Sequence, residues 1–149
     1  MKLRVYLDTS VFSAYYDERV PQRMVETEDF WKGLDRFELS ISELTKEELA
    51  QTPDADKRQK LDKLAKPFTI LAVNREMKDL AQMYLDANIF TAVMFNDALH
   101  VAVAVLERQD VLLSWNFKHL VNRRRRAMIS EVNISKGLPT IEILAPPEI

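Results

Sequence analysis

The sequence predicts an α/β fold: a central, mostly parallel sheet of about five strands with helices on both faces. Short runs rich in valine, isoleucine and leucine alternate with longer segments whose apolar residues recur at helical spacing. The alternation continues along the whole chain, without a repeat, a low-complexity segment or a linker. A chain of 149 residues can bury one real core and is short for two. We therefore expect a single domain over residues 1–149.

The expected strands are short apolar segments bounded by polar or turn residues. The segment FELSIS alternates apolar and polar residues, as a half-buried strand does. Ligands of parallel sheets bind beyond the carboxyl ends of the strands, so functional residues are expected there. The expected strands are residues 1–7, Phe37–Ser42, Phe68–Val73, Asp110–Ser114 and Thr140–Leu144.

Helices are expected between the strands, and several carry start or stop signals. Pro21 suits the first turn of a helix, where its missing N–H would be unpaired anyway. Ser42 and Asn74 are typical N-caps, and Gly137 is a typical stop. The helix that starts near Asn96 is apolar on nearly every side and should be buried. The expected helices are Pro21–Arg36, Glu43–Gln51, Ala55–Lys66, one after Asn74, Asn96–Gln109 and Asn122–Lys136.

The composition excludes several classes of protein. Hydrophobic residues make up 47% of the chain and charged residues 30%, as in ordinary soluble domains. No apolar run reaches membrane-spanning length and no signal-like start is present, so we expect a cytoplasmic protein without a membrane partner. There is no cysteine, so any metal would be held by oxygen or histidine. A net charge of −2 does not by itself indicate a nucleic-acid binder, although a local basic patch could outweigh it.

Four polar side chains fall where strands end or where nearby helices begin. Asp8 follows the first strand, Glu48 lies about one turn beyond the second, Asp97 opens the buried helix, and Asn116 follows the fourth strand. Three carboxylates in a small volume are unfavourable without a cation. Oxygen ligands select Mg²⁺ or Mn²⁺, which can activate a water and offset charge on a phosphodiester. The pattern predicts metal-dependent phosphodiester hydrolysis.

Each of these residues also has a simpler explanation when taken alone. Asp8 is a favoured N-cap residue for a helix that follows it. Glu48 can belong to a solvated helix face. Asp97 in a first helical turn is stabilised by the helix dipole, by about 0.3–1 kcal/mol, and Asn116 in a loop needs no special reason. All four at one edge of a sheet are harder to explain separately, which favours a shared site.

Four segments, in order, resemble the signature segments of PIN domains: YLDTSVF (Tyr6–Phe12), SELTKEEL (Ser42–Leu49), NDALHVAVA (Asn96–Ala104) and LLSWNFKHL (Leu112–Leu120). The chain is most similar to the toxin-type PIN nucleases of type II toxin–antitoxin systems, the VapC-like group. Its final segment, GLPTIEILAPPEI, is similar to the family's closing strand and proline-rich tail. The resemblance implies a PIN-like domain over the whole chain, Mg²⁺ or Mn²⁺ at an acidic site, and endonucleolytic cleavage of RNA by a metal-activated water.

The resemblance also assigns site residues. It implies catalytic roles for Asp8, Glu48, Asp97 and Asn116, with Asp8, Asp97 and Glu48 as the metal ligands. Glu48, rather than Glu47, matches the glutamate before the leucine of the second segment. Asn116 stands where many members have aspartate. An amide brings no negative charge, which weakens the case for a tightly held second metal.

Three further residues lie close to these positions in the sequence. Ser10 is expected to hydrogen-bond to Asp8 and hold its carboxylate, with a simple N-cap as the alternative. His100 lies one turn after Asp97, so it is either a core residue or part of the same cleft. Trp115 is expected in the core, with stacking on an unpaired base as the alternative.

The segment NRRRRAMISEV (Asn122–Val132) carries the conspicuous basic run. Successive helical residues turn by about 100°, so the arginines fan around the axis. Arg123 and Arg126 are expected to point outward, where they could hold RNA phosphates. His119 could contact a phosphate or a backbone carbonyl, and a solvated helix is the alternative for the arginines. The expected buried stripe is Val121, Met128 and Val132.

The resemblance further implies an RNA substrate, a cognate antitoxin and a homodimer built on the N-terminal helices. The front aromatics are interpreted as core or as part of such a surface: Phe12, Tyr15, Tyr16, Phe30 and Trp31. One rival function is a phosphotransferase that forms an aspartyl-phosphate, but that class has a second acid where Ser10 stands. The other is a non-catalytic RNA- or protein-binding module on a PIN fold, for which Asn116 is the best argument.

Overall fold

A computed structural model describes all of residues 1–149 and contains one five-stranded sheet. The strands follow the order β3-β2-β1-β4-β5, and every neighbouring pair is parallel. The predicted α/β class is confirmed, and the sheet is parallel throughout rather than mostly so. The strands are β1 (Leu3–Leu7), β2 (Phe37–Ser42), β3 (Thr69–Leu71), β4 (Val111–Leu113) and β5 (Glu142–Leu144).

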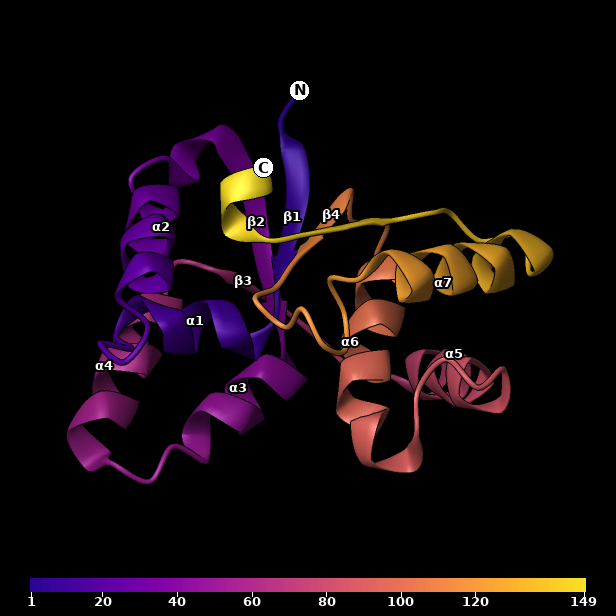
Figure 1. Cartoon of the computed structure of the whole chain (residues 1–149), viewed down its shortest axis with the longest axis horizontal. Helices are drawn as coiled ribbons and strands as arrows, with labels where there is room; N and C mark the ends of the chain where they lie inside the picture. The colour runs from indigo at the N-terminus through magenta and orange to yellow at the C-terminus, as the bar shows by residue number, and fades with distance from the viewer.

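Helices cover both faces of the sheet, as Figure 1 shows. On one side lie α1 (Thr9–Tyr15), α2 (Pro21–Trp31) and α4 (Ala55–Ala65), and on the other lie α5 (Arg75–Asp86), α6 (Phe95–Leu106) and α7 (Arg123–Ser135). Helix α3 (Glu43–Ala50) follows β2 at the carboxyl end of the sheet. None of the helices is both long and apolar enough to cross a membrane.

The central strands alternate their side chains between two cores, because successive residues of a strand point to opposite faces. In β1, Val5 and Leu7 pack under α1, α2 and α4, whereas Tyr6 packs under α5, α6 and α7. In β4, Leu112 faces the same core as Tyr6. Burial on both faces explains why these strands are almost continuously apolar.

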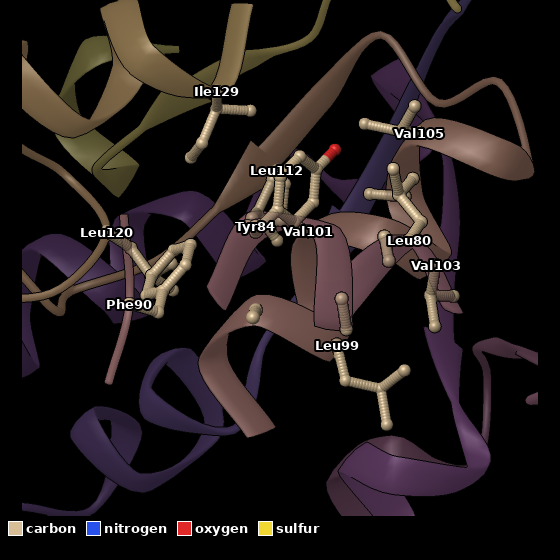
Figure 2. Close-up of a cluster of buried hydrophobic side chains, with 14 of the residues drawn as sticks. Leu80, Tyr84, Phe90, Leu99, Val101, Val103, Val105, Leu112, Leu120 and Ile129 are labelled. Atoms are coloured by element: carbon tan, nitrogen blue, oxygen red, sulfur yellow. The ribbon is translucent and has the colours of Figure 1, made fainter. Parts of the chain in front are cut away.

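Helix α6 is the most deeply buried of the three helices that cover the core around Tyr6. Every residue from Ala98 to Val105 is buried, which confirms the burial expected for this helix. Figure 2 shows the ring of Tyr84 from α5 lying among Val101 of α6, Leu112 of β4 and Leu80. Packing on most sides fixes α6 firmly, and its first turn carries Asp97.

Several predicted boundaries are confirmed by their caps. Ser42 accepts a hydrogen bond from the Thr45 N–H, and Asn74 Oδ1 accepts one from Met77 N. Gly137 follows α7 with a φ of 69°, a backbone conformation that favours glycine. Other boundaries differ: α2 ends at Trp31 and a short 3₁₀ helix (Leu34–Arg36) follows, and β3 is shorter than expected at the sheet edge.

Candidate active site

The four predicted residues lie at one end of the sheet, where β1 and β4 finish side by side (Figure 1). Asp8 caps α1 directly after β1, and Asn116 lies in the loop after β4. Glu48 projects from α3 and Asp97 from the first turn of α6. Hydrogen bonds through Ser114 and His119 connect Asp8, Asn116 and Asp97, whereas Glu48 belongs to a separate set that includes Thr9 and His100.

Asp8 is held by two serines and is almost completely buried, with 4% of its surface exposed. Its Oδ1 accepts from Ser10 N at 3.0 Å and from Ser10 Oγ at 2.6 Å, and its Oδ2 accepts from Ser114 Oγ at 2.5 Å. The expected hydrogen bond from Ser10 to Asp8 is present, and the N-cap of α1 is Asp8 rather than Ser10. Burial raises the pKa of Asp8, and the charge of Asp97 raises it further, against opposing effects of His100 and the two serines.

Glu48 is held from two sides. Its Oε1 accepts from Thr9 Oγ1 at 2.6 Å and from His100 Nε2 at 2.6 Å. Burial alone would raise the pKa of Glu48, but the hydrogen bonds and charge of His100, with Thr9 and Asn96, more than offset it and leave this pKa lowered. Glu47 is exposed, whereas Glu48 is held by Thr9 and His100, which favours Glu48 over Glu47 as the site residue.

His100 is both a core residue and a neighbour of the site. It is 2% exposed, and its Nδ1 lies 2.6 Å from the hydroxyl of Tyr6. The Tyr6 hydroxyl also lies 2.7 Å from Ser42 Oγ. A buried chain of polar groups therefore runs from the cap of α3 through Tyr6 and His100 to the Glu48 carboxylate.

Asn116 and Asp97 are joined through His119. Nδ1 of His119 donates to Asp97 Oδ2 at 2.9 Å, and its backbone N–H donates to Asn116 Oδ1 at 2.9 Å. Sequence reasoning missed this contact, since it expected a phosphate or a carbonyl beside His119. It also missed Ser114, whose only signal was a hydroxyl at the end of the strand beside β1.

A family model of the PIN domain matches residues 5–118, which is well over half of the chain. The chain belongs to the PIN domain family.

Solved structures support the PIN fold. VapBC-1 from nontypeable Haemophilus influenzae is 14% identical, with a TM-score of 0.62 over 97% of this chain and 99% of that one. FitAcB from Neisseria gonorrhoeae is 14% identical, with a TM-score of 0.57 over 97% and 99%. DNA-bound VapBC from Salmonella typhimurium is 16% identical, with a TM-score of 0.56 over 97% and 98%. At these identities the likeness concerns the fold. No curated protein matches the sequence.

The side chains of this PIN domain suit the divalent cation that the family implies. Asp8, Glu48 and Asp97 offer carboxylate oxygens and Asn116 offers an amide oxygen, the donors that Mg²⁺ and Mn²⁺ prefer. Burial is the main cause that raises the pKa of Asp8 and the charge of Asp97 adds to it, so a cation would stabilise the ionised carboxylate here. No three histidine, aspartate or glutamate side chains form a ready-made metal-binding group. Binding would therefore require the carboxylates to exchange some of their hydroxyl and imidazole contacts.

Trp115 is part of the core of the PIN domain, as expected. It is 5% exposed and its Nε1 donates to Thr27 Oγ1 at 2.9 Å, so its ring is not available to stack on a base. Phe117, two residues further on, is 45% exposed. The exposed aromatic residue of this loop is thus one that sequence reasoning did not single out.

The basic helix α7 is rotated relative to the expectation. Arg126 is half-buried and its Nη1 donates to the carbonyl of Ile143 at 2.9 Å, so the prediction that it points outward is wrong. The buried residues of α7 are Ile129 and Asn133, which share a helix face with Arg126. The expected stripe through Met128 and Val132 lies one residue off and is only partly buried. Arg123 is exposed, as expected.

Proposed function

We propose that this PIN domain is a metal-dependent endoribonuclease that hydrolyses RNA phosphodiester bonds with water as the nucleophile. The observation that carries the proposal is that Asp8, Glu48, Asp97 and Asn116 gather at the carboxyl end of the sheet, each held by hydrogen bonds. Three separate segments of chain supply the carboxylates, and each carboxylate is oriented by its own hydrogen-bond donors. Helix caps or solvated faces alone do not account for such an arrangement.

Asp8, Asp97 and Glu48 would hold the Mg²⁺ or Mn²⁺. The bound cation would lower the pKa of a water and offset charge that develops on the phosphate. Ser10 and Ser114 keep the Asp8 carboxylate in place. The lowered pKa of Glu48 keeps that carboxylate ionised at neutral pH.

Asn116 contributes an oriented amide without charge. Its Oδ1 accepts one hydrogen bond from the His119 N–H, which orients the side chain and leaves its second lone pair and the NH₂ group available. An amide donor at this position can orient a phosphate oxygen or a water. His119 fixes Asp97 in the same way, through Nδ1.

We further propose that the protein is the toxin of a type II toxin–antitoxin pair, with a cognate antitoxin and a homodimer in the cytoplasm. The support is that one similar solved structure is described as a toxin–antitoxin complex from Klebsiella pneumoniae, and others as VapBC-1 from Haemophilus influenzae and DNA-bound VapBC from Salmonella typhimurium. We also propose that the PIN-like domain spans residues 1–149, because β5, at one sheet edge, lies beyond the matched residues 5–118. The exposed Arg123 is retained as a proposed RNA phosphate contact.

A second candidate is a non-catalytic RNA- or protein-binding module on the same fold. Two observations favour it: position 116 carries no charge, and the carboxylates are not pre-arranged as a three-ligand group. This candidate predicts that the protein binds neither Mg²⁺ nor Mn²⁺ and cleaves no RNA.

The test compares wild type with Asp97→Asn and Glu48→Gln on a mixed pool of structured and single-stranded RNAs, with Mg²⁺, Mn²⁺ or EDTA. The matched control is Glu47→Gln, which removes an exposed carboxylate from the same turn of α3. We expect wild type and Glu47→Gln to cleave. Loss of a metal ligand should cost at least about 100-fold, more than the 10–100-fold typical of an outer-shell partner. Cleavage that persists in Asp97→Asn or in EDTA would overturn the assignment.

A further inference from the structure

A cavity of about 490 Å³ opens beside Asp8, between α1, the start of α2 and the loop after β4. Its lining includes Ser10, Ser13, Arg23, Asn116, Phe117 and Lys118. Ser10 and Asn116 also belong to the hydrogen-bond network of the candidate active site. The cavity and the carboxylates are therefore neighbours, so one ligand could occupy both.

Two cations of this cavity have no acidic partner. Arg23 and Lys118 line it, and neither forms an ion pair or donates a side-chain hydrogen bond. The carboxylate in the lining, Asp17, is already paired with Arg19 at 2.9 Å. The two unpaired cations can bind an anionic ligand. A phosphodiester strand is such a ligand, and it is long enough to contact Arg23 and Lys118 and to reach the carboxylates as well.

The cavity is also lined by a partly exposed aromatic side chain, Phe117. Phe117 is 45% exposed, and the guanidinium of Arg23 lies 5.3 Å from the centre of its ring. Arg23 also lies 5.4 Å from the centre of the ring of the buried Trp115, so its guanidinium contacts both rings. An aromatic ring next to an arginine is the usual platform on which proteins stack an unpaired base. The volume lies within the range of small-ligand sites.

We propose that this cavity is a nucleotide subsite, in which Phe117 stacks one unpaired base of a single-stranded RNA while Arg23 and Lys118 contact the adjoining phosphates. The inference rests on the proposed nuclease function, since it places the strand across Asp8. Phe117 and Arg23 are then specificity and positioning residues: they select a flexible, single-stranded segment and hold it next to the carboxylates.

The test measures binding by fluorescence anisotropy in an Asp97→Asn background, so that the probe is not cleaved. The probes are a fluorescein-labelled 12-mer of uridine and a 12-mer with the same ribose-phosphate chain and no bases. Phe117→Ala and Phe117→Leu should both weaken binding of the uridine 12-mer on the order of tenfold and leave binding of the 12-mer without bases unchanged. Arg23→Gln should weaken both probes and reduce the salt dependence by about one phosphate contact.

Arg36→Gln is the matched control. It also removes one charge and one arginine–aromatic contact, with Phe37 at 4.9 Å, but lies outside the cavity. It should leave both affinities unchanged. Equal effects of the Phe117 substitutions on both probes, or none, would overturn the subsite. If RNA cleavage by wild type is still lost in EDTA, the nuclease proposal stands without the subsite. If the parent chain binds neither probe at low salt, the subsite proposal fails, and the nuclease proposal is decided by the cleavage test alone.

Discussion

At the scale of single residues, each carboxylate of the candidate active site is oriented by donors that come from elsewhere in the chain. Two serines orient Asp8, a threonine and a histidine orient Glu48, and a histidine orients Asp97. Such supporting contacts tune how tightly carboxylates bind a metal. The contact that reaches furthest into the core runs from Glu48 through His100 to Tyr6.

Tyr6→Phe tests that contact. Removing the hydroxyl leaves His100 Nδ1 without a partner in a buried site and leaves Ser42 Oγ only the Thr45 N–H, so the unfolding free energy should fall by about 1–3 kcal/mol. His100 should then hold Glu48 less well, and Mn²⁺ affinity should fall about 10-fold or more. Calorimetry measures the affinity, and urea unfolding measures the stability.

The matched control is Tyr84→Phe. Tyr84 is also fully buried and also donates one hydrogen bond, to Asn133, but that bond lies between α5 and α7. Its loss should lower stability to a similar extent and leave Mn²⁺ affinity unchanged. Equal losses of affinity in the two variants would contradict a positioning role for the Tyr6–His100 pair.

The raised pKa of Asp8 predicts how the stability of the chain depends on pH. This pKa is raised in the folded chain, mainly by burial, so the native state binds this proton more tightly than the unfolded state does. In EDTA its ionisation should therefore cost stability as the pH rises from about 4, the usual aspartate pKa, through the folded value. Asp8→Asn lacks this cost, so its melting temperature should gain on that of wild type over this range.

Thermal unfolding of both chains in EDTA, from pH 4 to pH 8, measures the difference. If the difference in melting temperature between wild type and Asp8→Asn does not change with pH, burial of the Asp8 charge does not destabilise the native state. Saturating Mn²⁺ should reverse the order at neutral pH, because a ligand that binds only the native state stabilises it.

At the scale of elements, the helices were predictable where their apolar pattern was strong and the caps were clear. Helix α6 is apolar on nearly all sides, and its burial was predicted correctly. Helix α7 was placed at the right position in the sequence with the wrong face inward. Arginines can bury their stems and bond to backbone carbonyls, as Arg126 does, so charge alone did not identify the outer face.

The corrected face of α7 can be tested by truncation. Ile129 is 1% exposed, so Ile129→Ala should lower the unfolding free energy by about 2–5 kcal/mol. Met128→Ala, next to it, removes a side chain that is only partly buried and should cost clearly less. Urea unfolding of the two variants compares them directly. A larger loss in Met128→Ala would restore the predicted stripe.

At the scale of the whole molecule, the order of elements was enough to predict the sheet and to place Asp8, Asp97 and Asn116 together at the carboxyl ends of its strands. Parallel strands bring their carboxyl ends together whatever the loops do, so these positions follow from the topology. The partners of the carboxylates did not follow. Ser114 reaches Asp8 across 106 positions of sequence, and His119 reaches Asp97 across 22, through packing that no local pattern records. The cavity around Phe117 likewise depends on how α2 sits against the loop after β4.

The central claim is that three carboxylates, from the N-cap of α1 and from α3 and α6, together bind a divalent cation. Titration calorimetry with Mn²⁺ tests it most directly, on wild type, Asp97→Asn and Glu47→Gln, with folding of each chain verified by thermal unfolding. The account predicts saturable binding to wild type and Glu47→Gln, and binding to Asp97→Asn weakened at least about 100-fold. Equal binding by all three folded chains, or no binding by wild type, would contradict it.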